Sequence, residues 1–222
     1  MSNIVAVKQL TKTLGNIKVI DNISFNIKDG EFLAIQGPSG SGKTTLLGLL
    51  AGLEKADEGN IVVVDKDLTS MTEDELAIFR RYNIGFVFQS FNLIPTLDVI
   101  ENIALPLFPE HISRKDMFER AGKVAKAVGL MERLDHYPNE LSGGEQQRVA
   151  IARSLINDPK VVFADEPTGN LDSKTGQVVI ELLRKLNSER RQTVVLVTHD
   201  DKIANASDRI IKLLDGRIAN EN

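Results

Sequence analysis

Short runs of β-branched and other apolar residues recur along the chain and restrict the folds that it can adopt. In most of these runs nearly every position is apolar, which is typical of strands buried on both faces of a sheet. The runs are Ile4–Val7, Ile23–Ile27, Phe32–Gln36, Ile61–Val64, Ile84–Phe88, Val161–Asp165, Val194–Thr198 and Arg209–Leu214. Because helical segments separate several of them, the sequence predicts an α/β fold with a mostly parallel sheet.

Two parts of the chain depart from this alternation. The first strands are joined by turns such as Asp29-Gly30, which predicts antiparallel pairing and a small N-terminal β-subdomain. Between about Ser90 and Asp158 the strand pattern is missing, and only helix and loop patterns remain. We therefore predict a single domain over residues 1–222. Residues 1–89 and 158–222 would form the α/β core with its β-subdomain, and residues 90–157 an inserted helical subdomain.

Local capping patterns predict where two of the helices begin. Thr72 and Glu75 have the spacing of a capping box, in which each side chain bonds the backbone N–H of the other, and the helix is expected to run through Arg81. Ser113 is placed to cap the next helix, whose apolar residues recur at helical spacing.

Composition argues against several classes of protein. The chain has 222 residues and a formal net charge of −4, and this balance disfavours a general nucleic-acid binder, which needs a basic face. The absence of cysteine excludes disulfides and thiolate metal sites. The sequence has no signal-peptide core and no apolar run of the roughly 18–20 residues that span a bilayer. We therefore expect a cytoplasmic protein that reaches a membrane only through a partner.

A glycine-rich segment predicts a phosphate-binding loop. Gly37–Thr44 fits the pattern G-x-x-x-x-G-K-[ST] and lies between a predicted strand and a helical run. Glycines let backbone N–H groups turn toward phosphate oxygens, and the helix directs its positive end at the same anion. Lys43 is expected to contact the β- and γ-phosphates of a nucleotide, and Thr44 to ligate Mg²⁺. The predicted nucleotide-binding residues here are Gly37, Pro38, Ser39, Gly40, Ser41, Gly42, Lys43, Thr44 and Thr45.

Candidate hydrolysis residues follow three other predicted strands. Asp165 and Glu166 end a buried strand, and α/β sheets build ligand sites at the carboxyl ends of their strands. We expect Asp165 to hold Mg²⁺ and Glu166 to polarise an attacking water. His199 could donate to the γ-phosphate or to that water, although a single histidine at a strand end is more often structural. Gln89 is neutral, so it can contact Mg²⁺ or the water without titrating.

A second anion-binding helix start sets this chain apart from other proteins with a phosphate loop. Leu141–Arg148 reads L-S-G-G-E-Q-Q-R, in which Ser142 and the glycines are predicted to open a helix. One phosphate loop is enough to hold one nucleotide, so a monomer would have no use for this second anion-binding helix N-terminus. The segment resembles the signature motif of ABC-type ATPases. The phosphate loop, Gln89, the signature, Asp165–Asp172 and Thr198-His199 occur in the order of that family, over essentially the whole chain.

This resemblance implies a fold, a reaction and an assembly. It implies a P-loop NTPase core that binds ATP with Mg²⁺ and hydrolyses it. It also implies a head-to-tail homodimer in which ATP on the phosphate loop of one copy contacts the signature of the other. It assigns Ser142, Gly143, Gly144 and Glu145 to nucleotide binding at this contact, and Asn170, Leu171 and Asp172 to the loop that crosses between the two sites, with Asp172 also near the nucleotide. The implied partner is an integral membrane permease subunit, whose cytoplasmic helix enters a groove formed by Gln89 and Phe91–Ile103.

Two stretches of the sequence resemble one particular group within the family. Gly85–Asn102 and Asp165–Asp172 are similar to the lipoprotein-release, macrolide-export and cell-division group, in which a separate cassette drives a membrane subunit. The alternative is a soluble ABC-type ATPase without a transport role. Such proteins carry long coiled coils or two linked cassettes, for which this chain has no room.

One position departs from the family pattern. Most members stack an aromatic side chain on adenine near the start of the chain, whereas this chain has Leu14 after Thr11-Lys12-Thr13. Leu14 offers apolar contact without a π-face, and Val19 is a further candidate for contact with the base. We therefore expect weaker selectivity for adenine, with GTP partly accepted.

Overall fold

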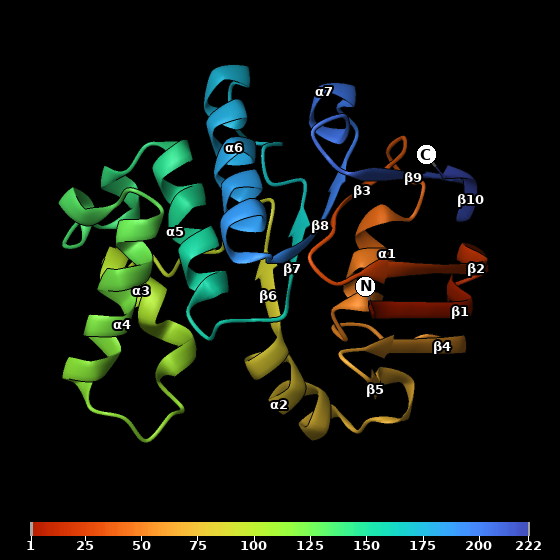
Figure 1. The fold of residues 1–222 in the computed structure, drawn as a ribbon, viewed down its shortest axis with the longest axis horizontal. Coiled ribbons are helices and arrows are strands. Elements are labelled where there is room, and N and C mark those ends of the chain that lie inside the picture. The colour runs from red at the N-terminus through yellow and green to blue at the C-terminus, as the bar shows by residue number, and fades with distance from the viewer. Residues whose placement is uncertain (1, 222) are drawn as a thin grey trace.

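The structure is a computed structural model that describes residues 2–221. Its larger sheet consists of β3 (Phe32–Gln36), β6 (Ile84–Val87), β7 (Val161–Asp165), β8 (Thr193–Thr198), β9 (Arg209–Leu214) and β10 (Arg217–Glu221). Their order across the sheet is β10-β9-β3-β8-β7-β6, and β10 alone is antiparallel to its neighbour. In Figure 1 this sheet lies between a group of helices on the left and a smaller sheet on the right. The predicted α/β class with a mostly parallel sheet is confirmed.

Alternate residues of the central strands pack into two separate hydrophobic cores. Phe32 and Ala34 of β3 lie in a core with α5 (Gly143–Leu155) and α6 (Ser173–Arg190). Leu33 and Ile35 lie in the other core, with α1 (Lys43–Leu50) and the smaller sheet. Successive residues of a strand point to opposite faces. The apolar run in the sequence therefore reflects a strand that is covered on both faces.

The smaller sheet is antiparallel and confirms the predicted β-subdomain. It consists of β1 (Asn3–Leu14), β2 (Ile17–Lys28), β4 (Glu58–Val63) and β5 (Lys66–Asp67), in the order β2-β1-β4-β5. β1 and β2 are each 12 residues long, well beyond their apolar runs. Outside those runs polar residues interrupt the apolar ones and burial is irregular, so the search for continuous apolar runs detected only part of each strand.

The interpretation of the Asp29-Gly30 turn was wrong. This turn connects β2 of the smaller sheet to β3 of the larger one, so it does not close an antiparallel hairpin. The hairpin of β1 and β2 is closed at Gly15-Asn16, where Gly15 has a φ of 61°. A local turn pattern predicts a change of chain direction but does not determine which sheet the next strand joins. β5 and β10 were also not predicted, because their residues are mostly polar.

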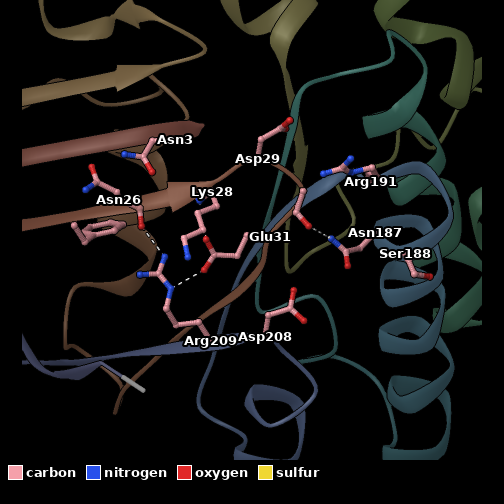
Figure 2. A pocket seen from close by; sticks show the side chains of 12 residues that line it. Asn3, Asn26, Lys28, Asp29, Glu31, Asn187, Ser188, Arg191, Asp208 and Arg209 are labelled. Carbon is pink, nitrogen blue, oxygen red and sulfur yellow. Dashed lines mark hydrogen bonds and ion pairs between the residues drawn. The ribbon is translucent and has the colours of Figure 1, made fainter. Parts of the chain in front are cut away.

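Polar side chains hold the two sheets together at the amino ends of the parallel strands. Nε of Arg209 bonds Oε1 of Glu31 at 2.6 Å, and its Nη2 donates to the carbonyl of Asn26 in β2 at 2.6 Å. From α6, Nδ2 of Asn187 donates to the carbonyl of Gly30 at 2.9 Å. Figure 2 shows how these groups converge. They fix the turn between the two sheets at the edge opposite to the phosphate loop.

The remaining described elements are helices and short 3-10 turns. They are α2 (Glu73–Asn83), α3 (Val99–Ala104), α4 (Arg114–Ala127) and α7 (Asp201–Ala204), with 3-10 turns at Leu68–Ser70, Leu105–Leu107, Met131–Arg133 and Pro138–Glu140. The predicted capping box of Thr72 and Glu75 and the predicted cap at Ser113 are present. Between β6 and β7 the structure contains helices, 3-10 turns and loops. In the described part of the chain, no helix is both long and apolar enough to cross a membrane.

Candidate functional site

The predicted site residues follow four strands that are neighbours in the larger sheet. β3, β8, β7 and β6 lie side by side and run parallel, so their carboxyl ends share one edge. The phosphate loop follows β3 and His199 follows β8. Asp165 ends β7, Glu166 comes directly after it, and Gln89 follows β6. Segments that are far apart in the sequence therefore meet where α/β sheets build ligand sites.

The glycines of the phosphate loop are required by close backbone contacts. Gly42 has a φ of 98°, and a Cβ there would overlap the carbonyl oxygen of Val19. A Cβ at Gly37 would overlap the carbonyl oxygen of Leu213. The loop therefore lies tightly against β2 and β9, in a conformation that favours glycine.

Donor groups collect inside this loop. Lys43 is only 5% exposed, and its Nζ donates to the carbonyl of Pro38 at 2.9 Å. The Oγ of Ser41 is buried and has no hydrogen-bond partner among the described residues. Buried polar atoms are normally satisfied, so an unpaired hydroxyl beside a buried ammonium fits a loop that receives an anion.

Thr44 and Asp165 bring together the oxygen ligands that a magnesium ion prefers. Oγ1 of Thr44 donates to Oδ1 of Asp165 at 3.0 Å. Burial raises the pKa of Asp165, the hydrogen bond from Thr44 opposes this shift, and the charge of Glu166 adds to it. A carboxylate that is costly to charge in the free protein suits a site that a cation would occupy. Gln89 lies at the same edge, with its side chain packed against Gly169.

Glu166 and His199 form a pair at the centre of this edge. Nδ1 of His199 lies 3.2 Å from Oε1 of Glu166, and the Glu166 N–H donates to the carbonyl of Val197 at 3.2 Å. Glu166 has a φ of 41°, in the left-handed region that non-glycine residues rarely adopt. Backbone strain of this kind concentrates at functional sites. A cavity of about 340 Å³ opens beside the pair, lined also by Asp172 and Gly169.

The signature segment begins α5 with the predicted cap. Ser142 N–H donates to Oε2 of Glu145 at 2.9 Å, and the Ser142 hydroxyl bonds the same oxygen at 2.7 Å. Nε of Arg133 lies 2.9 Å from Oε1, the other carboxylate oxygen of Glu145. Together, the bonds from Ser142 and Arg133 lower the pKa of Glu145 to about 2. Gly144 is buried, and a Cβ there would overlap the methyl group of Thr175. The small size of Gly144 is therefore needed for packing within the same copy.

The structure does not bring the signature to the phosphate loop of its own chain. Figure 1 shows α5 and α1 on opposite sides of α6. Asp172 is engaged locally as the N-cap of α6, where its side chain accepts bonds from the N–H groups of Lys174 and Thr175. Ser142, Gly143 and Glu145 therefore lie away from the phosphate loop of their own copy, whereas Asp172 lines the cavity beside Glu166 and His199.

Leu14 and Val19 lie on the hairpin next to the phosphate loop. Leu14 is 50% exposed at the end of β1 and pairs with Ile17 of β2. Val19 is half-buried, and its carbonyl oxygen faces Gly42. The apolar side chain of Leu14 is therefore free to contact a base.

Two side chains hold the backbone around Gln89 by contacts that were not predicted from the sequence. Asn170 donates to the carbonyl of Gln89 at 2.8 Å, and Arg153 of α5 donates to the carbonyls of Phe91 and Asn92 at 2.8 and 2.5 Å. Phe91 and Asn92 both have positive φ values, 59° and 50°. The acceptors are backbone groups 61 to 81 residues away, so no sequence pattern marks these contacts.

A larger cavity lies elsewhere. It measures about 750 Å³ and is lined by residues at the junction of the two sheets, shown in Figure 2. Glu31, Asp208 and Arg209 in its wall are engaged in the ion pairs of the fold itself. Cavity size is therefore a poor guide here, and the convergence of residues at the opposite edge of the sheet defines the candidate site.

Comparison with known proteins shows the family to which the chain belongs. The profile of a family described as ABC transporter matches residues 20–169. The ABC transporter ATP-binding protein MJ0796 of Methanocaldococcus jannaschii is 48% identical, over 98% of this chain and 96% of that protein. A solved dimeric structure of MJ0796 with ADP and phosphate has a TM-score of 0.90 and 46% identity, covering 98% of this chain and 97% of that one.

Two further relatives differ in length. The lipoprotein-releasing system ATP-binding protein LolD of Cytophaga hutchinsonii is 43% identical, over 98% of this chain and 100% of that protein. The macrolide export ATP-binding/permease protein MacB of Rhodopirellula baltica is 47% identical over 93% of this chain, but the match covers only 30% of that longer protein. With the family profile matched over most of its length, this chain belongs to the ABC transporter family as an ATP-binding cassette.

Proposed function

We propose that this chain is the ATP-hydrolysing subunit of an ABC transporter and works as a homodimer that encloses two ATP molecules. The main support is that one copy has two candidate phosphate-binding helix N-termini, and these two N-termini lie apart. The phosphate loop precedes α1, and Ser142 caps α5 on the other side of α6. A second copy in head-to-tail orientation supplies the missing half of each site. The solved MJ0796 structures are dimeric, which supports this assembly.

Nucleotide binding uses the donors of the phosphate loop. Backbone N–H groups of the loop Gly37–Thr44, in which Pro38 has none, bond the phosphate oxygens, joined by the hydroxyl of Ser41. Lys43 exchanges its bond with the Pro38 carbonyl for the β- and γ-phosphates. Thr44, Asp165 and Gln89 would hold Mg²⁺, which supplies positive charge beside the phosphate oxygens.

Hydrolysis is assigned to the pair at the end of β7 and β8. Glu166 polarises the water that attacks the γ-phosphorus, while the bond from that phosphorus to the ADP oxygen breaks. His199 orients the γ-phosphate or the water. Ser142 and Gly144 of the second copy bond the same γ-phosphate, with Gly143, Glu145 and Asp172 beside them. ATP therefore favours the closed dimer, and its hydrolysis allows the dimer to reopen.

The proposed partner is an integral membrane permease subunit. LolD belongs to a lipoprotein-releasing system, and MacB joins an ATP-binding part to a permease in one chain. By analogy, this chain associates with the cytoplasmic face of the membrane through such a partner, in a groove formed by Gln89 and Phe91–Ile103. Leu93 and Ile100 in this segment are only partly buried against the core. Residues 90–157 are proposed to act as the helical subdomain that transmits the movement.

The deciding experiment uses Glu166→Gln. This variant should bind ATP but hydrolyse it at least about a hundredfold more slowly, because the general base is lost. A closed dimer should then accumulate with ATP and be absent without nucleotide, as measured by light scattering after gel filtration. A chain that stays monomeric at saturating ATP and micromolar protein contradicts the proposed dimer.

A second experiment addresses the partner. Tagged Glu166→Gln chain is purified with ATP from detergent-solubilised membranes, and the bound proteins are identified by mass spectrometry. An integral membrane protein supports the transporter function, and few spans with a large extracytoplasmic domain support the lipoprotein-release and macrolide-export group. Recovery of soluble partners alone favours the alternative, a soluble ABC-type ATPase.

A further inference from the structure

The end of β3 carries a polar contact to which the proposed reaction assigns no role. Gln36, the last residue of β3, is 9% exposed, and its Nε2 donates to Oδ1 of Asp201 at 2.6 Å. A short bond from an amide to a carboxylate is among the stronger hydrogen bonds in proteins, because the acceptor is charged. This bond joins the strand that leads into the phosphate loop to the first residue of α7.

Both ends of the bond adjoin groups of the proposed site. Gly37 follows Gln36 directly and opens the phosphate loop. On the other side, His199 precedes Asp201 by two residues and lies 3.2 Å from Glu166. Gln36, Asp201 and His199 line one cavity of about 360 Å³ together with the start of the phosphate loop. The contact therefore connects two parts of the site that belong to different strands.

α7 is too short to hold its position without tertiary contacts. It has four residues, about one turn, and a helix of this length has little stability of its own. Asp200 caps it by accepting from the Lys202 N–H at 2.7 Å, and the Asp200 N–H donates to Oγ1 of Thr198 at 3.0 Å, so both bonds lie within the segment that follows β8. Ala204 anchors the far end in the core. At the near end, next to His199, the bond from Gln36 links α7 to the neighbouring strand β3, in addition to the local bond between Asp200 and Thr198.

We infer that Gln36 is a positioning residue that holds His199 beside Glu166 by way of Asp201, without itself touching the nucleotide. The inference rests on the proposed hydrolytic function. Without the bond, the near end of α7 can move away from β3. His199 moves with it, because only one residue separates His199 from Asp201. A displacement of this kind weakens the hydrolysis step more than the binding of ATP, since the phosphate loop keeps its own contacts.

The test compares variants at the two ends of the bond. Gln36→Met keeps a similar side-chain volume but removes the donor. We expect it to lower kcat for ATP roughly tenfold and to change KM by less than about twofold. Asp201→Ala should reproduce this loss, whereas Asp201→Asn keeps an accepting oxygen and should retain most of the activity. Asn205→Ala, at the exposed far end of α7, is the matched control and should behave as the unsubstituted chain.

A double-mutant cycle separates positioning from a general loss of structure. In a His199→Ala background, Gln36→Met should cause no further loss of kcat, because Gln36 acts through His199. An unchanged kcat in Gln36→Met, or an equal loss with and without His199, would overturn the inference. Asp201→Ala alters an exposed side chain and so provides the same test if Gln36→Met fails to fold. A failure of the proposed function gives a different result, because the unsubstituted chain would then not hydrolyse ATP at all.

Discussion

Single residues determine how well this chain distinguishes one nucleotide from another. Leu14 occupies the position where the family pattern has an aromatic residue, and half of its surface is exposed on the hairpin that contacts the phosphate loop through Val19. An aliphatic side chain covers a base by apolar contact alone, whereas an aromatic ring adds stacking worth roughly 1–3 kcal/mol. The phosphates, by contrast, are contacted by Lys43 and the loop whatever base they carry.

We therefore predict that the chain binds ATP and GTP with affinities that differ by less than about fivefold, and that Leu14→Tyr strengthens ATP binding by about 1 kcal/mol. Both values can be measured by titration calorimetry with nonhydrolysable analogues. Leu53→Tyr is the matched control, because Leu53 has a similar exposure of 47% but follows α1 at the far end from the loop. If the chain binds ATP much more tightly than GTP and Leu14→Tyr does not change either affinity, this explanation is wrong.

At the scale of elements, the start of α5 is stabilised by a network of charged and polar groups. The carboxylate of Glu145 accepts from the N–H and hydroxyl of Ser142 on one oxygen and from Arg133 on the other. Its pKa of about 2 lies below the ordinary value of 4.5. The ionised carboxylate therefore stabilises the folded state above pH 4.5, and this contribution is lost as the pH falls from about 5 toward 2.

Glu145→Gln should remove this pH-dependent contribution. We expect the free energy of unfolding at pH 7 to fall by on the order of 2 kcal/mol, and the difference from the unsubstituted chain to shrink as the pH drops below 5. Urea unfolding between pH 7 and pH 4 measures both effects. Glu132→Gln, which changes an exposed carboxylate nearby, should leave the pH profile as it is. A constant difference at every pH would contradict the assigned network.

At the scale of the whole molecule, the phosphate loop and the start of α5 lie apart. This arrangement predicts that one copy binds the nucleotide with its phosphate loop and the other copy contacts it with Ser142. The described hydrogen bonds of Ser142 are with Glu145 and Gln146, and none of them reaches the phosphate loop of the same copy. Binding of ATP by one copy should therefore not depend on Ser142, whereas dimerisation should. Lys43 belongs to the loop itself, so binding by one copy should depend on it.

Ser142→Arg should bind ATP within about twofold of the unsubstituted affinity but should not dimerise in the Glu166→Gln background, because a bulky cation replaces the group that meets the other nucleotide. Lys43→Ala should lose most nucleotide affinity as a monomer. Fluorescent-nucleotide titration and light scattering give the two readouts. Loss of monomer binding in Ser142→Arg would show that the signature acts within its own copy.

Much of this structure could be predicted from local chemistry. The apolar runs identified the strands of the parallel sheet, and the caps at Thr72, Ser113 and Ser142 marked helix starts, because these signals depend on neighbouring residues alone. The predictions failed where a residue's partner is distant in the sequence. The Asp29-Gly30 turn was assigned to the wrong sheet connection, and β10 was missed.

The sequence by itself determined the family, the phosphate loop and the order of the candidate site residues, since each of these depends on residue types at fixed spacings. The tertiary structure alone decided which strand ends lie side by side, how Glu166 meets His199, and that Gln36 bonds Asp201. It also decided that the signature lies away from the phosphate loop of its own copy. These outcomes depend on strand order and on contacts between residues dozens of positions apart, and local spacing carries no information about such contacts.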